Sequence, residues 1–400
     1  RTNDEVRDAL AACRALARRF DVVVANPPYM GSSSFNPFMS KWMKKHYPDS
    51  CKDLCTAFIE RGYTLAREQG YSAMVTMQSW MFLGSFEKMR SRIIDEKTIL
   101  ALAHLGARAF DAIGGEVVSV TADVLYNGKT VSRGTYVRLV DIVGSEPKRE
   151  KMIEAIQNPD CGWFYRADAS TFHDIPGSPI AYWAGEGIIR SFKTGVPLGQ
   201  ITDTHLGMAT CNNERFLRLW WEPEGSTRVV PSQYPYQWDI TRWVPYCKGG
   251  IFRRWFGNDE YVLDWKDRGR LLEENNAVMV KERLRFHPMT SWTRVSSGSL
   301  AARYKPAGYM FDMTGPAAFG DKGDLLVSLA FLNSSIASQI ATFLSASLDF
   351  QPGQIGMYPL VKSEDKRGTI IGLVDTCIGL SRADWDSQET SWDFKRNLLV

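Results

Sequence analysis

The sequence lacks any apolar run long enough to cross a membrane. Its longest apolar stretches, such as Thr98–Leu105, fall far short of the roughly 20 residues that a bilayer-spanning helix needs. The opening residues Arg1–Asp4 are polar and lead directly into a helical pattern, which does not resemble a signal peptide. We therefore expect neither a membrane protein nor a secreted one.

Cysteine and histidine are scarce, and their spacing does not suggest a metal site. The seven cysteines show no paired spacing, which is typical of reduced thiols in the cytoplasm. His46, Cys51 and Cys55 are close in sequence, but the two cysteines would lie one turn apart on a helix, without the wider Cys/His pairing of structural zinc sites. None of the five histidines pairs with a candidate serine or cysteine nucleophile. We expect a cytoplasmic protein with no metal cofactor.

The chain also lacks the features of natural ends. It begins at Arg1 without an initiator methionine, and residues 4–19 already have the pattern of an alanine- and arginine-rich amphipathic helix. It stops at Asn397–Val400 without a helix breaker or a polar tail. We expect the chain to be an internal fragment of a longer protein.

What the sequence does contain is the pattern of a globular α/β protein. Hydrophobic content of 44% and charged content of 23% argue against disorder, and 400 residues suffice for two domains. The continuous apolar run Asp21–Ala25 predicts a parallel strand buried on both faces. Further strands are expected at Tyr71–Gln78 and Ile99–Leu105, and further helices at Asp53–Arg67 and Phe86–Glu96.

This alternation ends in an expected β-hairpin. Val117–Tyr126 and Thr135–Val143 have strand composition, and the turn-forming pair Asn127–Gly128 follows the first of them. Alternating strands and helices closed by a hairpin predict an α/β fold with an open sheet over about residues 1–145.

Composition changes after this region. Nine of the thirteen tryptophans lie between Trp163 and Trp292, among short strand patterns and Gly-, Pro- and Asn-rich loops. Residues 241–310 hold 13 Lys and Arg against 7 Asp and Glu, although the whole chain has a net charge of only +3. The basic charge is therefore concentrated in the second region. An apolar helical stretch follows at Asp324–Leu348, and a Trp-containing tail at Asp384–Arg396.

The tetrapeptide Asn26, Pro27, Pro28 and Tyr29 directly follows the first predicted strand. In open α/β sheets, ligands bind beyond the carboxyl ends of the strands. The amino nitrogen of adenine is a poor nucleophile because its lone pair is delocalised into the ring. Two acceptors aimed at its two protons would free that lone pair, and the Asn26 side-chain oxygen and the Pro27 carbonyl oxygen can supply them.

Tyr29 offers a flat face on which an extruded base can stack. Catalysis would then consist of positioning and electrostatic stabilisation, with no covalent step. In the alternative interpretation, the two prolines merely end the strand and Tyr29 packs on a neighbour. The rarity of this tetrapeptide and its place after a valine-rich strand favour the functional interpretation.

These segments resemble a known family. Phe20–Tyr29 resembles motif IV of the gamma-type N6-adenine DNA methyltransferases, and Tyr71–Trp80 resembles the strand and loop that follow it. Leu105–Asp111, continued by the strand Glu116–Tyr126, is similar to motif VIII, whose aromatic residue contacts the flipped base. The resemblance implies that Phe110 has this role, opposite Tyr29. A buried aromatic at a strand end is the alternative for Phe110.

The resemblance narrows further along the chain and covers about residues 20–396. The segments that carry it are Thr210–Arg218, Trp220–Glu222, Arg242–Asn258, Leu332–Ser334, Asp349–Gly353 and Asp384–Arg396. Together they are most similar to the adenine methyltransferases of BREX phage-defence systems, and next to restriction–methylation fusion enzymes. Cys211 departs from the pattern, because the family's Thr-Gly-x-Asn turn has glycine at this position.

The resemblance implies the arrangement of the whole chain. Residues 1–145 would be the C-terminal part of a Rossmann-like methyltransferase sheet. Residues 146–365 would form a mixed α+β target-recognition domain, and residues 366–400 would begin a further C-terminal segment. The implied partners are double-stranded DNA and other phage-defence proteins.

Candidate DNA-binding residues lie in both regions. Lys248, Arg253 and Arg254 occur in a Gly-rich, aromatic setting, and arginine suits both phosphate and guanine. Arg215 lies in the first target-recognition segment, and Lys41 follows the catalytic loop together with two more lysines. We expect these residues to contact DNA; for Lys41, an ordinary surface charge is an equally good interpretation.

The methyl donor S-adenosylmethionine is implied, but its site is expected upstream of Arg1. Such enzymes hold the donor with a Gly-rich loop and an acidic residue after two strands that precede the catalytic loop, and only 25 residues precede it here. Trp183–Gly187 mimics a Gly-x-Gly loop, but no adequate apolar strand precedes it. We expect this chain alone to bind the donor weakly or not at all.

The sequence thus predicts site-specific transfer of a methyl group to the N6 amino group of a flipped adenine, in bacterial phage defence. One alternative is a DNA-recognition or scanning subunit without turnover of its own. Another is methylation of a protein or RNA amide by the same loop. The intact tetrapeptide argues against the first alternative, and the basic, aromatic-rich second region argues against the second.

Overall fold

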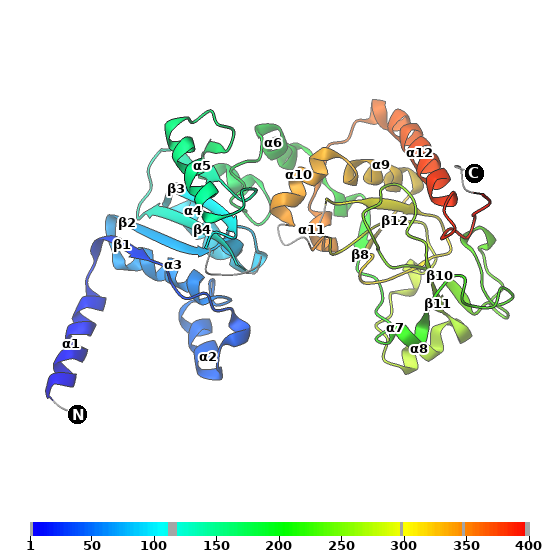
Figure 1. The fold of residues 1–400 in the computed structure, drawn as a ribbon, viewed down its shortest axis with the longest axis horizontal. Coiled ribbons are helices and arrows are strands. Elements are labelled where there is room, and N and C mark those ends of the chain that lie inside the picture. Colours follow the sequence, from blue (N-terminus) through cyan, green and yellow to red (C-terminus); the bar gives the residue numbers. More distant parts are fainter. Residues whose placement is uncertain (1–2, 111–117, 297–298, 346–348, 397–400) are drawn as a thin grey trace. The chain divides into compact units, whose positions relative to one another are not determined.

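The computed structural model describes residues 3–110, 118–296, 299–345 and 349–396. The chain divides into two compact units, Arg1–Gly185 and Glu186–Val400, here called unit 1 and unit 2 (Figure 1). Among the described residues no single helix is long and apolar enough to cross a membrane. The helices Lys322–Leu332 and Ser335–Leu344 together reach such a length and composition, but they are bent by 75° at their break.

Unit 1 is built on a six-stranded sheet with the order β1-β2-β4-β3-β5-β6. The strands are β1 (Phe20–Ala25), β2 (Ala66–Met77), β3 (Thr98–Ala107), β4 (Ser119–Tyr126), β5 (Gly134–Arg138) and β6 (Phe164–Ala167). β1 is parallel to β2, and β5 is parallel to β3, whereas β4 is antiparallel to both β2 and β3. β1, β2, β3 and β5 therefore run in one direction and end at one edge of the sheet. The expected α/β fold is confirmed.

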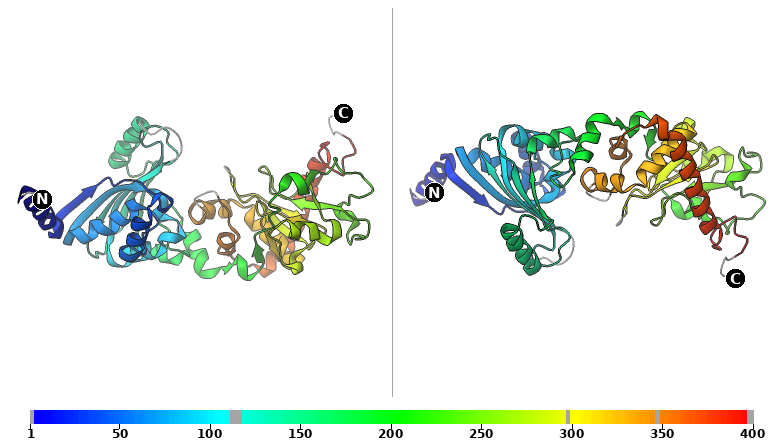
Figure 2. Two further views of the ribbon diagram at one scale, coloured as in Figure 1. Left: turned by 90° about the horizontal axis from the view of Figure 1, so that it is seen from below. Right: turned by 90° about the horizontal axis from the view of Figure 1, so that it is seen from above.

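The helices of unit 1 are α1 (Asn3–Ala17), α2 (Pro37–His46), α3 (Leu54–Leu65), α4 (Glu87–Glu96) and α5 (Ser145–Gln157). α3 and α4 contribute Ile59 and Ile93 to a core that also holds Met74 of β2 and Leu102 of β3. Along β2, alternate residues are buried and partly exposed, so the core covers mainly one face of this strand. α1 has no buried residue and extends away from the sheet (Figures 1 and 2).

The expectation that the first strand is buried on both faces is wrong. Among the described strands β1 pairs only with β2, and it forms the edge of the sheet. Val22 is 55% exposed and Val24 is 73% exposed. A continuous apolar run reports the composition of a strand, but it does not report how many neighbours the strand has.

The expected hairpin is also wrong, because β3 lies between β4 and β5. The Asn127 side-chain amide donates hydrogen bonds to the carbonyl oxygens of Ala66 and Arg67, at the beginning of β2. The Thr98 hydroxyl donates a hydrogen bond to the Gly128 carbonyl oxygen, at the beginning of β3. The turn is thus held against the ends of two other strands. After the turn the chain crosses over β3, and β5 pairs on the far side of β3.

Unit 1 extends beyond residue 145, where the sequence suggested a boundary. β6 pairs with β5 in an antiparallel register, and Phe172, Ile180 and Tyr182 join the same core as Tyr136. The Tyr136 and Tyr182 rings are stacked, with centroids 4.6 Å apart. The segment that contains β6 therefore belongs to unit 1, although its composition resembles that of the second region.

Unit 2 has two four-stranded sheets and a two-stranded pair, with the orders β14-β10-β11-β9, β13-β12-β15-β8 and β16-β7. The strands are β7 (Val196–Pro197), β8 (Asp203–His205), β9 (Leu217–Leu219), β10 (Trp243–Cys247), β11 (Tyr261–Asp264), β12 (Met289–Trp292), β13 (Ala302–Lys305), β14 (Met310–Phe311), β15 (Ala317–Phe319) and β16 (Pro359–Leu360). Its tryptophans include core residues: Trp265 and Trp292 are both buried.

The helices of unit 2 are α6 (Glu186–Thr194), α7 (Asn213–Phe216), α8 (Arg270–Glu274), α9 (Lys322–Leu332), α10 (Ser335–Leu344), α11 (Pro352–Gly356) and α12 (Glu364–Asp386). The expected apolar helical stretch is thus broken in two. The Ser334 hydroxyl accepts a hydrogen bond from the Ala337 amide and caps α10, while the Asn333 side chain binds both backbone groups of Ala302. Strands and helices mix in unit 2, as expected.

Candidate active site

The tetrapeptide Asn26–Tyr29 lies directly after β1, at the edge where the parallel strands end. The Tyr29 hydroxyl is a donor within 3.2 Å of the Asn26 side-chain oxygen Oδ1 and within 3.3 Å of the Val75 carbonyl oxygen in β2. Asn26 is exposed, whereas Pro27 is buried. The loop thus presents an amide side chain to solvent while Tyr29 ties it to the neighbouring strand.

Backbone hydrogen bonds fix the loop to the beginning of α3. The Leu54 amide donates to the Met30 carbonyl oxygen at 2.9 Å, and the Ser32 amide donates to the Lys52 carbonyl oxygen at 2.8 Å. The Asp53 side chain caps α3. Because α3 packs on the sheet through its buried face, the loop Asn26–Tyr29 is held by the core of unit 1.

Burial disfavours ionisation of two groups at the loop, Tyr29 and Cys55. It raises the pKa of Tyr29 to about 12, with a smaller contribution from Cys55, so Tyr29 retains its phenolic proton near pH 7. Burial likewise raises the pKa of the Cys55 thiol to about 12. A protonated thiol is neither a nucleophile nor a metal ligand. In the described part of the chain, no three His, Cys, Asp or Glu side chains are grouped as metal ligands.

A buried histidine that sequence reasoning did not single out lies near the same edge. His104 of β3 has Nε2 at 2.8 Å from the Gln78 side-chain oxygen and Nδ1 at 3.0 Å from the Tyr182 hydroxyl. Burial lowers the pKa of His104 to about 3, with smaller contributions from Arg138 and Lys148. The neutral ring therefore positions Gln78, the first residue after β2. The signal in the sequence that could have identified His104 is a polar residue within an otherwise apolar strand pattern.

Phe110 follows β3, so it lies at the same edge of the sheet as Asn26–Tyr29. It is partly buried. In the strand order, β2 and β4 stand between β1 and β3, and the described contacts include none between the rings of Phe110 and Tyr29. Residues 111–117, which belong to the motif VIII segment, lie outside the described residues. A stacking role for Phe110 stays a prediction.

Arg253 and Arg254 differ in their surroundings, although they are adjacent. Arg253 Nη1 forms an ion pair with Asp384 of α12, and its guanidinium lies 5.0 Å from the centroid of the Trp385 ring. The Arg254 guanidinium lies over the ring of the exposed Phe252, at 5.3 Å. Among the described residues Arg254 has no acidic partner. Of the two, Arg254 is the better placed to contact a ligand.

The other predicted DNA contacts are scattered. Lys248 lies over the ring of Tyr261 at 5.6 Å and is partly buried. Arg215 is exposed and donates a hydrogen bond to the Asn275 side-chain oxygen at 2.6 Å. Lys41 is exposed on α2 of unit 1. Within unit 2, the structure therefore gives each candidate an aromatic or amide neighbour.

Cys211, where the resemblance predicts glycine, has φ of 56°. This left-handed backbone conformation is one that glycine adopts without steric cost. Asn212 follows it and caps α7 by accepting a hydrogen bond from the Arg215 amide. The turn thus forms with cysteine in place of glycine, in a conformation that L side chains disfavour.

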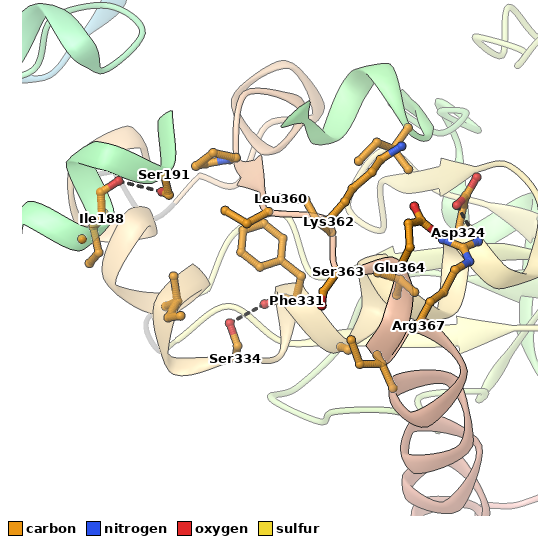
Figure 3. Close-up of a pocket in the computed structure, with 18 residues that line it drawn as sticks. Ile188, Ser191, Asp324, Phe331, Ser334, Leu360, Lys362, Ser363, Glu364 and Arg367 are labelled. Carbon is orange, nitrogen blue, oxygen red and sulfur yellow. Dashed lines mark hydrogen bonds and ion pairs between the residues drawn. The ribbon is translucent and has the colours of Figure 1, made fainter. Parts of the chain in front are cut away.

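Unit 2 also contains a cavity of about 470 Å³ (Figure 3). Its walls are mainly apolar and include Ile188, Phe331 and Leu360, and the ion pair between Asp324 and Arg367 lies on one side. Gly187, which belongs to the sequence that mimics a Gly-x-Gly loop, is one of the α6 residues at this cavity and does not follow a strand.

Comparison with known proteins identifies relatives over nearly the whole chain. Residues 4–110 match the family model of the Eco57I restriction-modification methylase. The chain is 38% identical, over 99% of its length, to the adenine-specific methyltransferase PglX of Lacticaseibacillus casei (strain Zhang). It is 37% identical, over 96% of its length, to the adenine-specific methyltransferase BrxX of Escherichia coli O9:H4 (strain HS). The chain is a relative of these adenine-specific methyltransferases.

The resemblance expected from the sequence is therefore confirmed. The chain spans about a third of the length of these curated relatives, 34% of PglX and 31% of BrxX. Among solved structures, a nuclease-deletion mutant of the Type ISP restriction-modification enzyme LlaGI, in complex with a DNA substrate mimic, has a TM-score of 0.53. That likeness covers 92% of this chain and 42% of LlaGI at 13% identity, so it bears on the fold alone.

Proposed function

We propose that this chain binds the acceptor base and recognises the target in an enzyme that methylates the N6 amino group of adenine in DNA, as part of bacterial phage defence. The observation that carries the proposal is the relationship between Asn26 and Tyr29. The tyrosine hydroxyl lies 3.2 Å from Asn26 Oδ1, at the carboxyl end of β1. The relatedness to PglX and BrxX supports the reaction class.

The geometry supports a specific role for each residue. Asn26 Oδ1 has two lone pairs, so it can accept a hydrogen bond from Tyr29 and another from the adenine amino group. The Pro27 carbonyl oxygen would accept the second amino proton, and Pro28 restricts the backbone of Pro27. With both protons held, the nitrogen lone pair is directed away from the ring and towards the incoming methyl group. Tyr29, whose pKa burial raises to about 12, keeps the proton that it donates to Asn26.

The donor of the methyl group in this proposal is S-adenosylmethionine. In the described part of unit 1, no glycine-rich loop follows a strand next to β1, and β1 is the edge of the sheet. The residues present therefore do not fit a complete donor site. They act on the adenine, which they bind and orient.

DNA as the partner is supported by the basic charge in residues 241–310 and by the DNA complex of the structural neighbour LlaGI. Phosphate contacts would position unit 2, and base contacts would specify the sequence. A recognition subunit without turnover is the second candidate function. The Asn26–Tyr29 contact favours the enzyme, because DNA scanning does not require an acceptor beside an extruded base.

The proposal is tested by Asn26→Ala in the full-length protein. We expect transfer of labelled methyl groups to DNA to fall by about 100- to 1000-fold, because one preorganised polar contact in the transition state is lost. DNA affinity should be close to that of the wild type, since Asn26 is exposed and reads no sequence. Methylation at the wild-type rate by Asn26→Ala would refute the mechanism.

A further inference from the structure

One helix of unit 1 exposes an unusual surface immediately after the catalytic loop. Phe38, Lys41, Trp42 and Lys45 of α2 are spaced i, i+3, i+4 and i+7, so they share one face of the helix. Phe38 is 77% exposed and Trp42 is 40% exposed, and both lysines are exposed. We call these four residues the α2 face. Met43, the one buried residue of α2, does not belong to it.

The α2 face is part of an excursion that leaves the catalytic loop and returns to it. The excursion runs from Gly31 to Asp53, and these two residues form an isolated β-bridge. The hydrogen bond between the Leu54 amide and the Met30 carbonyl oxygen closes the same junction. Figure 1 shows α2 next to α3, projecting away from the sheet. The segment that carries the α2 face is thus joined at both ends to the loop that carries Asn26.

The charge around the α2 face has one sign. Residues 22–48 contain no aspartate or glutamate, whereas they contain three lysines. Within the described residues none of these lysines, Lys41, Lys44 or Lys45, has an acidic partner. Two exposed aromatic rings between unpaired lysines on a projecting helix form a surface that is complementary to a polyanion with flat, stackable groups.

We propose that the α2 face binds DNA at the position that the target adenine leaves, with Phe38 against the unstacked bases and Lys41 and Lys45 on the adjoining phosphates. This inference rests on the proposed function, since it requires an extruded adenine at Asn26. Extruding a base leaves its neighbours without a stacking partner, and an aromatic ring stacked on them offsets that loss. An acidic protein surface could satisfy the lysines, but it would not provide stacking partners at the catalytic loop.

The test measures binding of the full-length protein to two 30-base-pair probes, an intact duplex and the same duplex with one abasic site. Fluorescence anisotropy is recorded over a range of salt concentrations. We expect Lys41→Ala/Lys45→Ala to weaken binding to both probes and to reduce the slope of log affinity against log salt by about 2, because each phosphate contact contributes about 0.9. Lys88→Ala, which alters an exposed lysine of α4, is the matched control and should leave the slope unchanged.

We expect the wild type to bind the abasic duplex about tenfold more tightly than the intact duplex. Phe38→Ala should abolish this preference and leave the salt slope unchanged. Phe38→Trp should restore that preference, whereas Phe38→Leu should not, because only the aromatic ring can stack. Since Phe38 is mostly exposed, these variants should unfold at the wild-type temperature. Binding and methylation at wild-type levels by the lysine and Phe38 variants would overturn the inference and indicate a protein partner for the α2 face. If Asn26→Ala is inactive in the same preparations, the proposed function stands; if Asn26→Ala is as active as the wild type, the proposed function fails on its own.

Discussion

Arg253 Nη1 lies 2.8 Å from Asp384 Oδ2 and joins the loop after β10 to the long helix α12. The arginine side chain is 18% exposed, whereas the aspartate is 66% exposed. Arg253 also stacks on Trp385, and its carbonyl oxygen accepts a hydrogen bond from the buried Arg303. A residue that the sequence assigned to DNA contact is therefore engaged within unit 2.

This arrangement leads to different expectations for the two adjacent arginines. Arg253→Ala should lower the free energy of unfolding by about 1–2 kcal/mol through lost packing and charge, and Asp384→Ala by less than about 1 kcal/mol because that partner is exposed. Arg254→Ala should instead weaken DNA binding. Thermal unfolding and DNA titrations of the three variants separate these roles. If Arg253→Ala relaxes sequence recognition while Asp384→Ala does not, Arg253 contacts bases after all.

Tyr29→Phe tests the hydrogen bond to Asn26 without removing the stacking face. We expect the methylation rate of the full-length protein to fall by about 3- to 10-fold, which corresponds to one hydrogen bond of about 0.5–1.5 kcal/mol. Tyr29→Ala should reduce the rate much further because the ring is lost as well. Since the pKa of Tyr29 is raised to about 12, ionisation of this residue should not lower the wild-type rate up to about pH 10. Equal rates for Tyr29→Phe and Tyr29→Ala would exclude a stacking role.

Asp123 of β4 is a buried carboxyl group, and neither of its oxygens has a hydrogen-bond partner. Burial raises its pKa from 3.8 to about 8. Because the folded-state pKa is the higher one, ionisation of this carboxyl does not lower the free energy of unfolding below about pH 4. As the pH rises towards 8, it lowers the free energy of unfolding progressively. Asp123→Asn, which cannot ionise, should therefore be more stable than the wild type at pH 8, and the difference should shrink towards pH 5. Denaturant unfolding at the two pH values measures it; a difference independent of pH would show that Asp123 does not titrate in this range.

Cys211 provides a test of backbone strain. Because its φ of 56° suits glycine, Cys211→Gly should stabilise the protein by about 0.5–1 kcal/mol, after allowance for the greater entropy of glycine in the unfolded chain. Cys211→Ala keeps a Cβ atom and should bring no gain. The midpoint of urea unfolding compares the two variants with the wild type. A gain for alanine equal to that for glycine would attribute the effect to the thiol and not to the backbone.

Local features of the fold could be predicted from the sequence, whereas strand neighbours could not. The strands β2 and β3 and the helices α3 and α4 lie where apolar periodicity placed them, and Asn26–Tyr29 follows β1 as expected. The position of β3 between β4 and β5 depends on pairing between segments far apart in sequence. A pattern of alternating or continuous apolar residues is the same for an edge strand and a central one, so it contains no information about these partners.

The prediction of side-chain roles from the sequence was limited in the same way. The acceptor role of Asn26 follows from residue types within four positions, and so it was accessible. The ion pair of Arg253 is formed with a residue 131 positions away, and the positioning of Gln78 by His104 spans 26 positions. Charge and composition indicated a basic region, but they did not show which basic side chain of that region forms an ion pair with α12.

The junction at Gly31 and Asp53 joins the two ends of the α2 excursion. Because its two ends are paired with each other, we expect exposed residues between them to be exchangeable without displacing Asn26 or Tyr29, whereas the buried Met43 and Ser50 have to be kept. A library of grafts between these two positions is a direct way to vary the surface beside Asn26–Tyr29 while keeping this loop in place.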